Sequence, residues 1–345
     1  MMSHYTVGLM ASQDRARWDD FVLRCPNATF FHRAGWQRIM EESLGHRTWF
    51  MYAADDGGEL HAVLPLAQVN SRLFGNTLCS LPFCVYGGIA ATDAHAAQAV
   101  DAAAQQLAAR LQVDHLEYRH RQPHHADWLH QDTYATFRKR LHADPQENML
   151  AIPRKQRAMV RKGITAELAS TVETDTGRFF DCYARSMHHL GTPMFSRRHF
   201  QLLREVFAED CQVLCVQQAS RPVCAVMSFR FRDQILPYYG GGGAQARVLA
   251  GNDFMYWEVM RRACLAGCTL FDFGRSKYGT GSFAFKKNWG FEPEPLHYDY
   301  QLHRSKQLKQ VQPLNPRYQM LIKAWRLLPL SVANLIGPHI VRQLG

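Results

Sequence analysis

The stretches LCSLPFCVYGG (78–88) and ILPYYGGGG (235–243) each read as a strand that ends in tyrosine and glycines. Each follows two apolar runs separated by a turn, and each precedes a helix and a short strand. These flanking elements are predicted at 48–53, 60–69, 94–111 and 115–119 in the first half, and at 212–217, 223–231, 252–266 and 269–273 in the second. A pattern that recurs within one chain indicates a duplicated structural unit. The sequence therefore predicts two related units.

The spacing within the two halves supports this duplication. Tyr86 precedes Glu117 by 31 residues, and Tyr239 precedes Asp272 by 33. A hairpin followed by a strand, a helix and another strand is typical of an α/β unit with a mixed sheet. We expect an α/β protein of two tandem domains, each a mixed sheet flanked by helices. The expected divisions are an N-terminal domain at 1–143, a basic linker helix at 144–166, a C-terminal domain with the active cleft at 167–300, and a basic amphipathic tail at 301–345.

Composition excludes several classes of protein. The chain of 345 residues is 47% hydrophobic and 20% charged, which is typical of globular proteins and not of disordered or collagen-like chains. Its net charge of +10 favours an anionic partner, such as a phosphate-bearing substrate, RNA or an acidic membrane surface. The first twenty residues lack the apolar run of a signal peptide, so a cytoplasmic location is expected.

The cysteine and histidine patterns predict neither disulfides nor a metal site. The nine cysteines are odd in number and none forms a C-x-x-C pair, which favours reduced, buried side chains. Five histidines lie close together, but Gln122-Pro123 breaks any helix there, and no carboxylate or thiolate completes a ligand set at a spacing typical of metal sites. These are His115, His120, His124, His125 and His130.

A basic segment, IPRKQRAMVRKG (152–163), lies between the two predicted units. At helical spacing Arg154, Arg157 and Arg161 share one face. Two interpretations remain open for this face. It is either a solvated surface between domains or a strip that binds the phosphates of a ligand.

The segment LFDFGRSKYGTGSFAFKKNWGF (270–291) is the most unusual of the chain. Arg275, Ser276 and Lys277 lie among glycines, where the backbone and the cations suit an anion. Phe283, Phe285 and Lys287 alternate, which predicts a strand with Lys286 on the opposite face. A second glycine-rich segment, 240–243, precedes the helix predicted to begin near Asn252. Its backbone amides are placed to hold a ligand at the start of that helix. A flexible turn explains the glycines equally well.

Five segments of the chain carry a resemblance to a known family: PRKQRAMVRKG, LGTPMF, LPYYGGG, NDFMYWEVMRRA and FDFGRSKYGTGSFAFKKNWGF. In these segments the chain resembles the FemAB-type proteins, and within them the branch associated with PEP-CTERM and exosortase systems of Gram-negative bacteria. The resemblance implies two GNAT-like domains and an N-acyltransferase acting on an amine of a cell-envelope, peptidoglycan-like or exopolysaccharide precursor. It implies no tightly bound cofactor and a donor that is either aminoacyl-tRNA or acyl-CoA. Phe285-Lys286 matches a family Phe-Lys pair whose lysine is tied to acyl transfer.

Acyl transfer to an amine needs a deprotonated amine and a stabilised oxyanion. We assign Asp272 to orient or deprotonate the amine, Lys286 to the oxyanion or to a phosphate of the donor, and Tyr239 to protonate the leaving group. An ion pair between Asp272 and Arg275 is an equal alternative for Asp272. The residues expected to bind donor or substrate are Arg154, Arg157, Arg161, Tyr238, Gly241, Asn252, Arg275, Ser276, Lys277 and Lys287. The alternative function is a catalytically inactive anion-binding, RNA-binding or scaffolding protein on the same fold.

The C-terminal tail mixes apolar and basic residues over 318–328. This segment is too short to span a bilayer, but its pattern suits a helix that lies at a membrane surface. Packing against the second domain is the other interpretation. Peripheral contact with the inner membrane is therefore one possible partner interaction of the chain.

Overall fold

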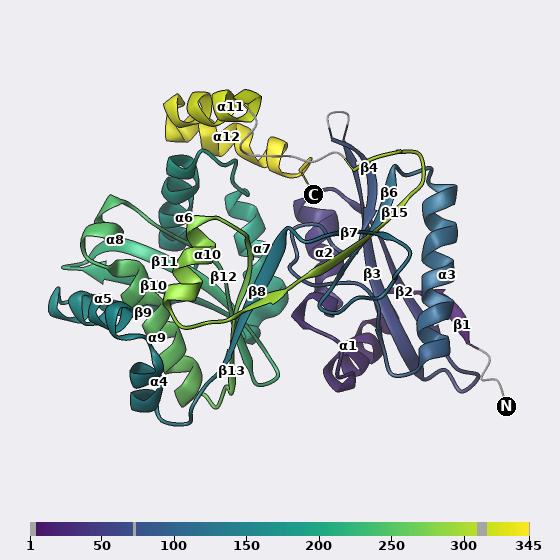
Figure 1. Cartoon of the computed structure of the whole chain (residues 1–345), viewed down its shortest axis with the longest axis horizontal. Helices are drawn as coiled ribbons and strands as arrows, with labels where there is room; N and C mark the ends of the chain where they lie inside the picture. Colours follow the sequence, from purple (N-terminus) through teal and green to yellow (C-terminus); the bar gives the residue numbers. More distant parts are fainter. Residues whose placement is uncertain (1–4, 72–73, 309–315, 345) are drawn as a thin grey trace. The chain divides into compact units, whose positions relative to one another are not determined.

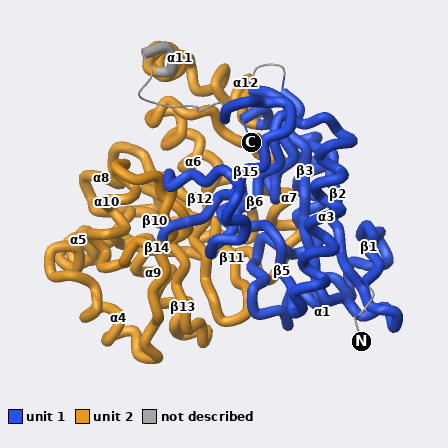
Figure 2. Tube along the Cα trace, turned by 45° about the vertical axis from the view of Figure 1, so that its right-hand side comes forward, with its two compact units in different colours: residues 1–133, 295–310, 342–345 blue, residues 134–294, 311–341 orange. Residues whose placement is uncertain are grey.

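The computed structural model of the protein describes residues 5–71, 74–308 and 316–344 (Figure 1). The chain divides into two compact units (Figure 2). Each unit is built on one sheet. Unit 1 comprises 1–133, 295–310 and 342–345, and unit 2 comprises 134–294 and 311–341. The predicted α/β fold with two mixed sheets is confirmed.

Unit 1 carries a sheet in the order β1-β2-β3-β4-β6-β15-β7, with the short β5 paired to β3. Its strands are β1 (Thr6–Leu9), β2 (Arg47–Ala54), β3 (Leu60–Ser71), β4 (Gly75–Cys79), β5 (Ala90–Ala91), β6 (His115–His120), β7 (Leu129–Gln131) and β15 (His297–Leu302). Its helices are α1 (Arg15–Arg24), α2 (Gly35–Arg38) and α3 (Ala94–Arg110). The alanine-rich α3 buries small side chains such as Ala96, Ala104 and Ala108, so it packs closely on the sheet.

Unit 2 carries a sheet in the order β14-β8-β13-β12-β11-β10-β9. Its strands are β8 (Tyr134–Arg140), β9 (Ala169–Glu173), β10 (Cys211–Gln218), β11 (Arg221–Phe231), β12 (Gln234–Gly242), β13 (Leu270–Lys277) and β14 (Pro293–Pro295). Its helices are α4 (Pro145–Ala151), α5 (Arg154–Thr165), α6 (Gly177–Leu190), α7 (Arg197–Phe207), α8 (Ala244–Val248), α9 (Gly251–Leu265), α10 (Gly281–Asn288), α11 (Pro316–Leu327) and α12 (Leu330–Val341).

The predicted duplication is present in the strand pairing. In unit 1 the hairpin β2–β3 leads to β4, then α3, then β6, which pairs parallel to β4. In unit 2 the hairpin β10–β11 leads to β12, then α9, then β13, which pairs parallel to β12. The nine cysteines are buried and free, as their spacing predicts.

Each sheet includes one strand whose place in the sequence predicts that it belongs to the other domain. β8 lies within the expected first domain, but it pairs antiparallel to β13 in unit 2. β15 lies within the expected second domain, but it pairs antiparallel to β6 in unit 1. The division of the chain therefore falls at Thr133/Tyr134 and at Glu294/Pro295 and not at 143 and 300. These pairings join strands that lie far apart in the sequence, so they cannot be predicted from the turn residues that mark a hairpin.

Two local predictions are wrong. The strand expected through 78–88 ends at Cys79, because Leu81 and Phe83 have positive φ angles that break the extended backbone before Tyr86. The strand expected at 283–287 is the helix α10. Its N-terminus is capped by Thr280, whose side chain accepts a hydrogen bond from the Phe283 amide. The alternation over the five residues 283–287 is too short to oppose that cap.

No helix among the described residues is long and apolar enough to cross a membrane.

Candidate acyl-transfer site

Lys286 is a buried cation on α10, with 9% of its surface exposed. Its Nζ donates hydrogen bonds to the carbonyl oxygens of Gly274 (3.0 Å) and Arg275 (2.9 Å). The same atom lies 5.5 Å from the ring centre of Phe137 and 5.7 Å from that of Phe273. A lysine ammonium has three donors, so the protonated side chain keeps one donor beyond these two carbonyls.

Burial lowers the pKa of Lys286 to about 7 from its ordinary 10.5. Asp272 opposes this shift and Arg275 adds to it, so both charges act on the lysine. At neutral pH the side chain therefore interconverts between an ammonium that donates and an amine that accepts a proton. A lysine in this state is typical of functional sites.

The shifted pKa predicts a pH dependence of stability. The folded pKa of Lys286 is about 7 and the ordinary value is 10.5, so the unfolded chain binds more protons between these values. The cost of burying the charge is fully present below pH 7 and disappears as the pH rises toward 10.5, so this group makes the folded state more stable as pH rises. We expect Lys286→Met to lose this rise, whereas Lys287→Met, on an exposed side chain, keeps it.

Urea unfolding of the wild type and both variants between about pH 7 and 9.5 measures this effect. The free energy of unfolding of the wild type, relative to Lys286→Met, should increase over the interval. An equal slope in these two proteins would mean that Lys286 keeps its ordinary pKa in the folded state.

An irregularity of β13 creates the acceptors for Lys286. The pairing of β13 with β8 shifts register between Asp272 and Arg275, and Gly274 has a φ angle of +66° there. The Gly274 amide donates to Oδ1 of Asp272 at 2.8 Å, which stabilises the bulge. Glycine is needed because this backbone conformation is costly for other residues. The bulge presents two consecutive carbonyls to the lysine.

β12 and β13 pair only at their first two positions, Gln234↔Leu270 and Ile235↔Phe271. β12 continues to Gly242 and β13 to Lys277, so the remaining parts of these strands do not share a ladder. Ligands of open α/β sheets bind outside the carboxyl ends of the strands, where neighbouring strands separate. Lys286 bonds to β13 beyond this separation.

Asp272 lies on the other face of β13 from Lys286. Phe271 and Phe273, its neighbours, pack in the core cluster on the Lys286 side, and strand alternation directs Asp272 the opposite way. Asp272 is 2% exposed, and its Oδ2 lies 3.3 Å from Nε of Arg138 on β8. In unit 1 the corresponding Glu117 is also buried and paired with an arginine, Arg119, at 2.6 Å.

This recurrence favours a structural role for the acidic residue in both units. In unit 2 the carboxylate holds β8 and the β13 bulge in place. We therefore propose that Asp272 positions the acceptors of Lys286 and does not itself exchange a proton with substrate.

The other residues of the glycine segment lie near the same bulge. The guanidinium of Arg275 lies 4.8 Å from the ring centre of Tyr134. Ser276 is 4% exposed, and its hydroxyl has no hydrogen-bond partner among the described residues. Lys277 is half-buried and Lys287 is exposed. The structure thus places Lys286, Arg275 and their neighbours at one stretch of β13, with Asp272 on the opposite face of that strand.

Tyr239 belongs to an aromatic cluster with α6 and α7. Its hydroxyl lies 3.4 Å from Nε2 of His199, and its ring contacts Tyr183 and Phe200 edge-on. Burial lowers the pKa of His199 to about 3, so this imidazole is neutral at physiological pH. Tyr238 is half-buried, with its ring 4.6 Å from that of Tyr239. His199 has no sequence motif and was not predicted.

Gly241 allows a close approach between β12 and α6. A side-chain Cβ built at this position would lie 2.7 Å from Cβ of Ser186 and 2.9 Å from Cα of Tyr183. The glycine is therefore explained by packing, and a ligand is not needed to account for it. Asn252 is half-buried in the first turn of α9, where helix amides lack intrahelical partners.

The predicted basic helix exists as α5, and Arg154 and Arg161 are exposed on it. Arg157 is half-buried and donates to the Leu150 carbonyl at 2.9 Å. The buried face of α5 packs on α9 through a polar contact that the sequence did not predict. Oδ1 of Asp253 accepts from the Gln156 amide, and from the Trp289 indole at 3.1 Å.

This contact joins α5, α9 and the end of α10, one turn after Lys286. It fixes the helix that carries the lysine.

A cavity of about 370 Å³ lies elsewhere in unit 2, at the start of α6. Its lining consists of Thr174, Asp175, Thr176, Gly177, Arg197, Gln201 and Arg204, none of which the sequence analysis selected.

Comparison with known proteins agrees with this description. Residues 150–287 match the acetyltransferase (GNAT) domain family. No curated protein matches the chain. Among solved structures the chain is similar to FemX, with a TM-score of 0.66 and 13% identity over 92% of this chain and 100% of that one.

Two further structures are similar over most of their lengths. The C-terminal domain of a protein assigned as a lysylphosphatidylglycerol synthetase from Agrobacterium fabrum matches with a TM-score of 0.58 and 13% identity, over 84% of this chain and 92% of that one. A tandem GNAT protein from the clavulanic acid biosynthesis pathway matches with a TM-score of 0.53 and 11% identity, over 86% of this chain and 97% of that one. The chain therefore matches the GNAT acetyltransferase domain family over residues 150–287, and its α/β fold with two mixed sheets is similar to that of tandem GNAT structures.

Proposed function

We propose that the protein is an N-acyltransferase that moves an acyl or aminoacyl group onto an amine of a cell-envelope or exopolysaccharide precursor. The observation that carries the proposal is Lys286, a buried lysine with a pKa of about 7, held at the β13 bulge within the matched GNAT domain. The similarity to FemX, and the resemblance to the FemAB branch of the PEP-CTERM systems, support the choice of an envelope or exopolysaccharide acceptor.

In the proposed reaction the acceptor nitrogen forms a bond to the carbonyl carbon of the donor. The bond from that carbon to the CoA sulfur, or to the ribose oxygen of tRNA, breaks. The amine loses one proton and the leaving group gains one, so no oxidant or other co-reactant is needed. The free N–H of protonated Lys286 stabilises the negative charge that develops on the carbonyl oxygen.

Other residues assist this step in the proposal. Tyr239 supplies the proton of the leaving group. Arg275, Lys277 and the exposed arginines of α5 bind the phosphates of the donor, which either acyl-CoA or aminoacyl-tRNA carries.

Labelled donors test the proposal. The purified chain is offered acyl-CoA or aminoacyl-tRNA, labelled in the acyl group, with amine-bearing envelope precursors. We expect label to move from one donor class to one amine. Protein that melts cooperatively and transfers label from neither donor would contradict the proposal, and would favour an inactive anion-binding protein.

The donor class is distinguished by thermal stability. A donor present at about 100 times its dissociation constant should stabilise the folded chain by roughly 2.7 kcal/mol. CoA and uncharged tRNA are compared at the same series of concentrations, and the one that raises the melting temperature identifies the donor class.

We also propose that the C-terminal helices contact the surface of an anionic membrane. α11 and α12 both pack on α6, and Trp325 and Gly337 lie on their buried side. Several large apolar side chains nevertheless remain exposed, among them Leu321 (64%), Leu327 (85%) and Leu335 (71%). Residues 303–345 contain seven lysines and arginines and no aspartate or glutamate. Exposed apolar side chains beside cations are typical of proteins that bind anionic bilayers.

Replacing Leu327 by glutamate is expected to weaken vesicle binding about tenfold or more, because one buried leucine contributes about 1.5–3 kcal/mol. Leu265→Glu, at a position 65% exposed at the end of α9, serves as the control and should bind normally. Sedimentation with phosphatidylcholine vesicles, with and without phosphatidylglycerol, measures the effect. Equal binding to both vesicles, or an equal loss in both variants, would contradict a membrane surface on α11 and α12.

A further inference from the structure

Unit 1 holds a cluster of histidines at the end of β6 that the acyl-transfer proposal does not use. His120 is the last residue of β6, and His124 and His125 follow in the loop that leads to β7. Their rings are in contact, with centroids 4.8 Å apart for His120 and His124 and 4.6 Å apart for His124 and His125.

A carboxylate from another element completes this cluster. Asp101 lies on α3, on the side that faces the sheet, and is 9% exposed. Its Oδ2 lies 3.3 Å from Nε2 of His125. One ligand atom from each of Asp101, His124 and His125 lies within 4.8 Å of the other two. The sequence analysis found no carboxylate for these histidines because Asp101 is 23 residues before His124.

The side chains of the cluster are held in place by their neighbours. Tyr118 donates to Oδ1 of Asp101 at 2.9 Å, and Gln105 donates to Oδ2 at 2.9 Å. The ring of His125 stacks on Trp128, with centroids 3.9 Å apart and an angle of 8° between the planes. The His125 amide donates to Oδ2 of the buried Asp299 at 3.2 Å. Hydrogen-bond and stacking partners of this kind hold metal ligands in the orientation that binding needs.

A further histidine lies beside this cluster. His120 is 9% exposed, and its Nε2 has no hydrogen-bond partner among the described residues. Buried polar atoms without a partner are uncommon.

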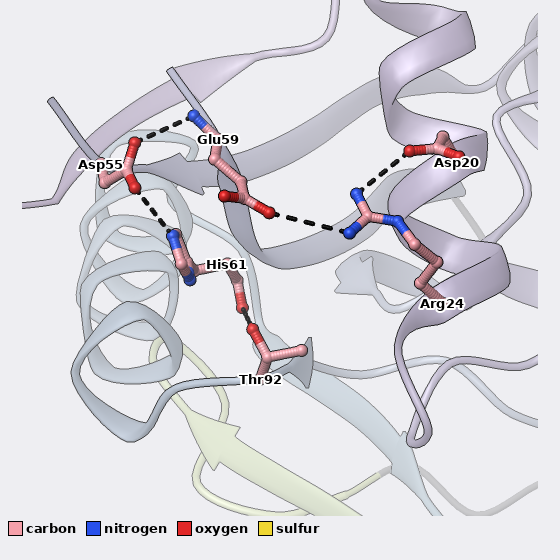
Figure 3. Close-up of polar contacts among 6 residues, drawn as sticks. All are labelled: Asp20, Arg24, Asp55, Glu59, His61 and Thr92. Carbon is pink, nitrogen blue, oxygen red and sulfur yellow. Dashed lines mark hydrogen bonds and ion pairs between the residues drawn. The ribbon is translucent and has the colours of Figure 1, made fainter. Parts of the chain in front are cut away.

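A second group of similar composition behaves differently. Asp55, Glu59 and His61 also lie close together, in the β2–β3 hairpin (Figure 3). Oδ1 of Asp55 accepts from the Glu59 amide, Oδ2 accepts from His61, and the Glu59 carboxylate is paired with Arg24 at 3.7 Å. These contacts show that the group stabilises the hairpin turn. A substitution in this group therefore serves as a control in the metal-binding experiment below.

We propose that Asp101, His124 and His125 bind a divalent transition-metal ion of the zinc type, with a remaining position for water or a neighbouring imidazole. Two imidazoles with one carboxylate suit Zn²⁺, whereas Mg²⁺ and Ca²⁺ prefer oxygen ligands alone. The bound ion joins α3 to the 121–128 loop. The site lies wholly in unit 1, so its function is structural support of that loop and is independent of the acyl-transfer proposal.

Metal titration of the untagged full chain tests the site. Calorimetry with Zn²⁺, after treatment with a chelator, should give one equivalent of binding to the wild type, and Mg²⁺ should give none. Co²⁺ should produce visible absorption bands typical of nitrogen and oxygen ligands. His124→Ala, at an exposed position, should weaken Zn²⁺ binding about 10-fold or more without unfolding the protein.

Asp101→Asn should also weaken Zn²⁺ binding, and circular dichroism of this variant confirms that it folds. His61→Ala, in the hairpin group, should bind Zn²⁺ as the wild type does. The proposal is overturned if the wild type binds no Zn²⁺, if His124→Ala binds it unchanged, or if His61→Ala removes the binding.

Discussion

Replacing Lys286 by methionine is expected to lower kcat for acyl transfer about 10²–10³-fold, the usual effect of losing one preorganised donor to an oxyanion. Methionine keeps an unbranched side chain beside the rings of Phe137 and Phe273, so the packing of α10 is retained. The carbonyls of Gly274 and Arg275 lose one partner each, but the cost of a buried charge is also removed. Initial rates at saturating donor and acceptor measure the change.

Lys287→Met is the matched control, because it removes the same charge from the next residue of the same helix at an exposed position. It should keep at least about half of the wild-type rate, as surface substitutions usually do. An equal loss in both variants would indicate a diffuse basic patch. A loss only in Lys287→Met would show that the functional lysine was chosen wrongly.

Replacing Gly241 by alanine is expected to destabilise unit 2 by about 1–3 kcal/mol, because the new methyl group overpacks the contact between β12 and α6. Two of the atoms it would meet, Cα of Tyr183 and the Cys182 carbonyl oxygen, belong to the backbone and cannot rotate away. Urea unfolding gives the change in stability. A ligand-binding role would instead predict weaker donor binding at normal stability.

Gly243, two residues further along the same glycine run, supplies the control. A Cβ built there meets nothing within 4 Å, and its φ of −77° is allowed for alanine. Gly243→Ala should therefore change stability by no more than about 0.5 kcal/mol. If Gly241→Ala is as stable as Gly243→Ala, the packing explanation for Gly241 is wrong.

The order of elements could be predicted from sequence because each unit repeats it. Hairpins, the helices α3 and α9, and the parallel strands after them all follow from local hydrophobic patterns and turn residues. The pairing of β8 with the sheet of unit 2, and of β15 with the sheet of unit 1, could not be predicted from sequence, because strands distant in sequence pair without a local signal. The pairing of β8 also places Arg138 beside Asp272, where the sequence analysis considered Arg275.

The candidate site was only partly accessible from sequence. Lys286 was selected by its position in a family-like Phe-Lys pair, while the predicted strand gave it the wrong surroundings. The signals for a helix were present, since Thr280 is an N-cap residue and Gly290, with a φ of +76°, follows the end of α10. Contacts between elements, such as Gln156 with Asp253 and Asp101 with His125, leave no spacing pattern in the chain.

The most direct test of the central claim is the chemical form of the transferred acyl group. Wild-type protein is incubated with labelled donor and an amine-bearing envelope precursor, and the product is treated with neutral hydroxylamine, which cleaves esters and thioesters but leaves amides intact. We predict labelled product that survives hydroxylamine, and that falls about 10²–10³-fold in Lys286→Met but not in Lys287→Met. Label that hydroxylamine removes, or that forms equally well with Lys286→Met, would contradict N-acyl transfer at this site.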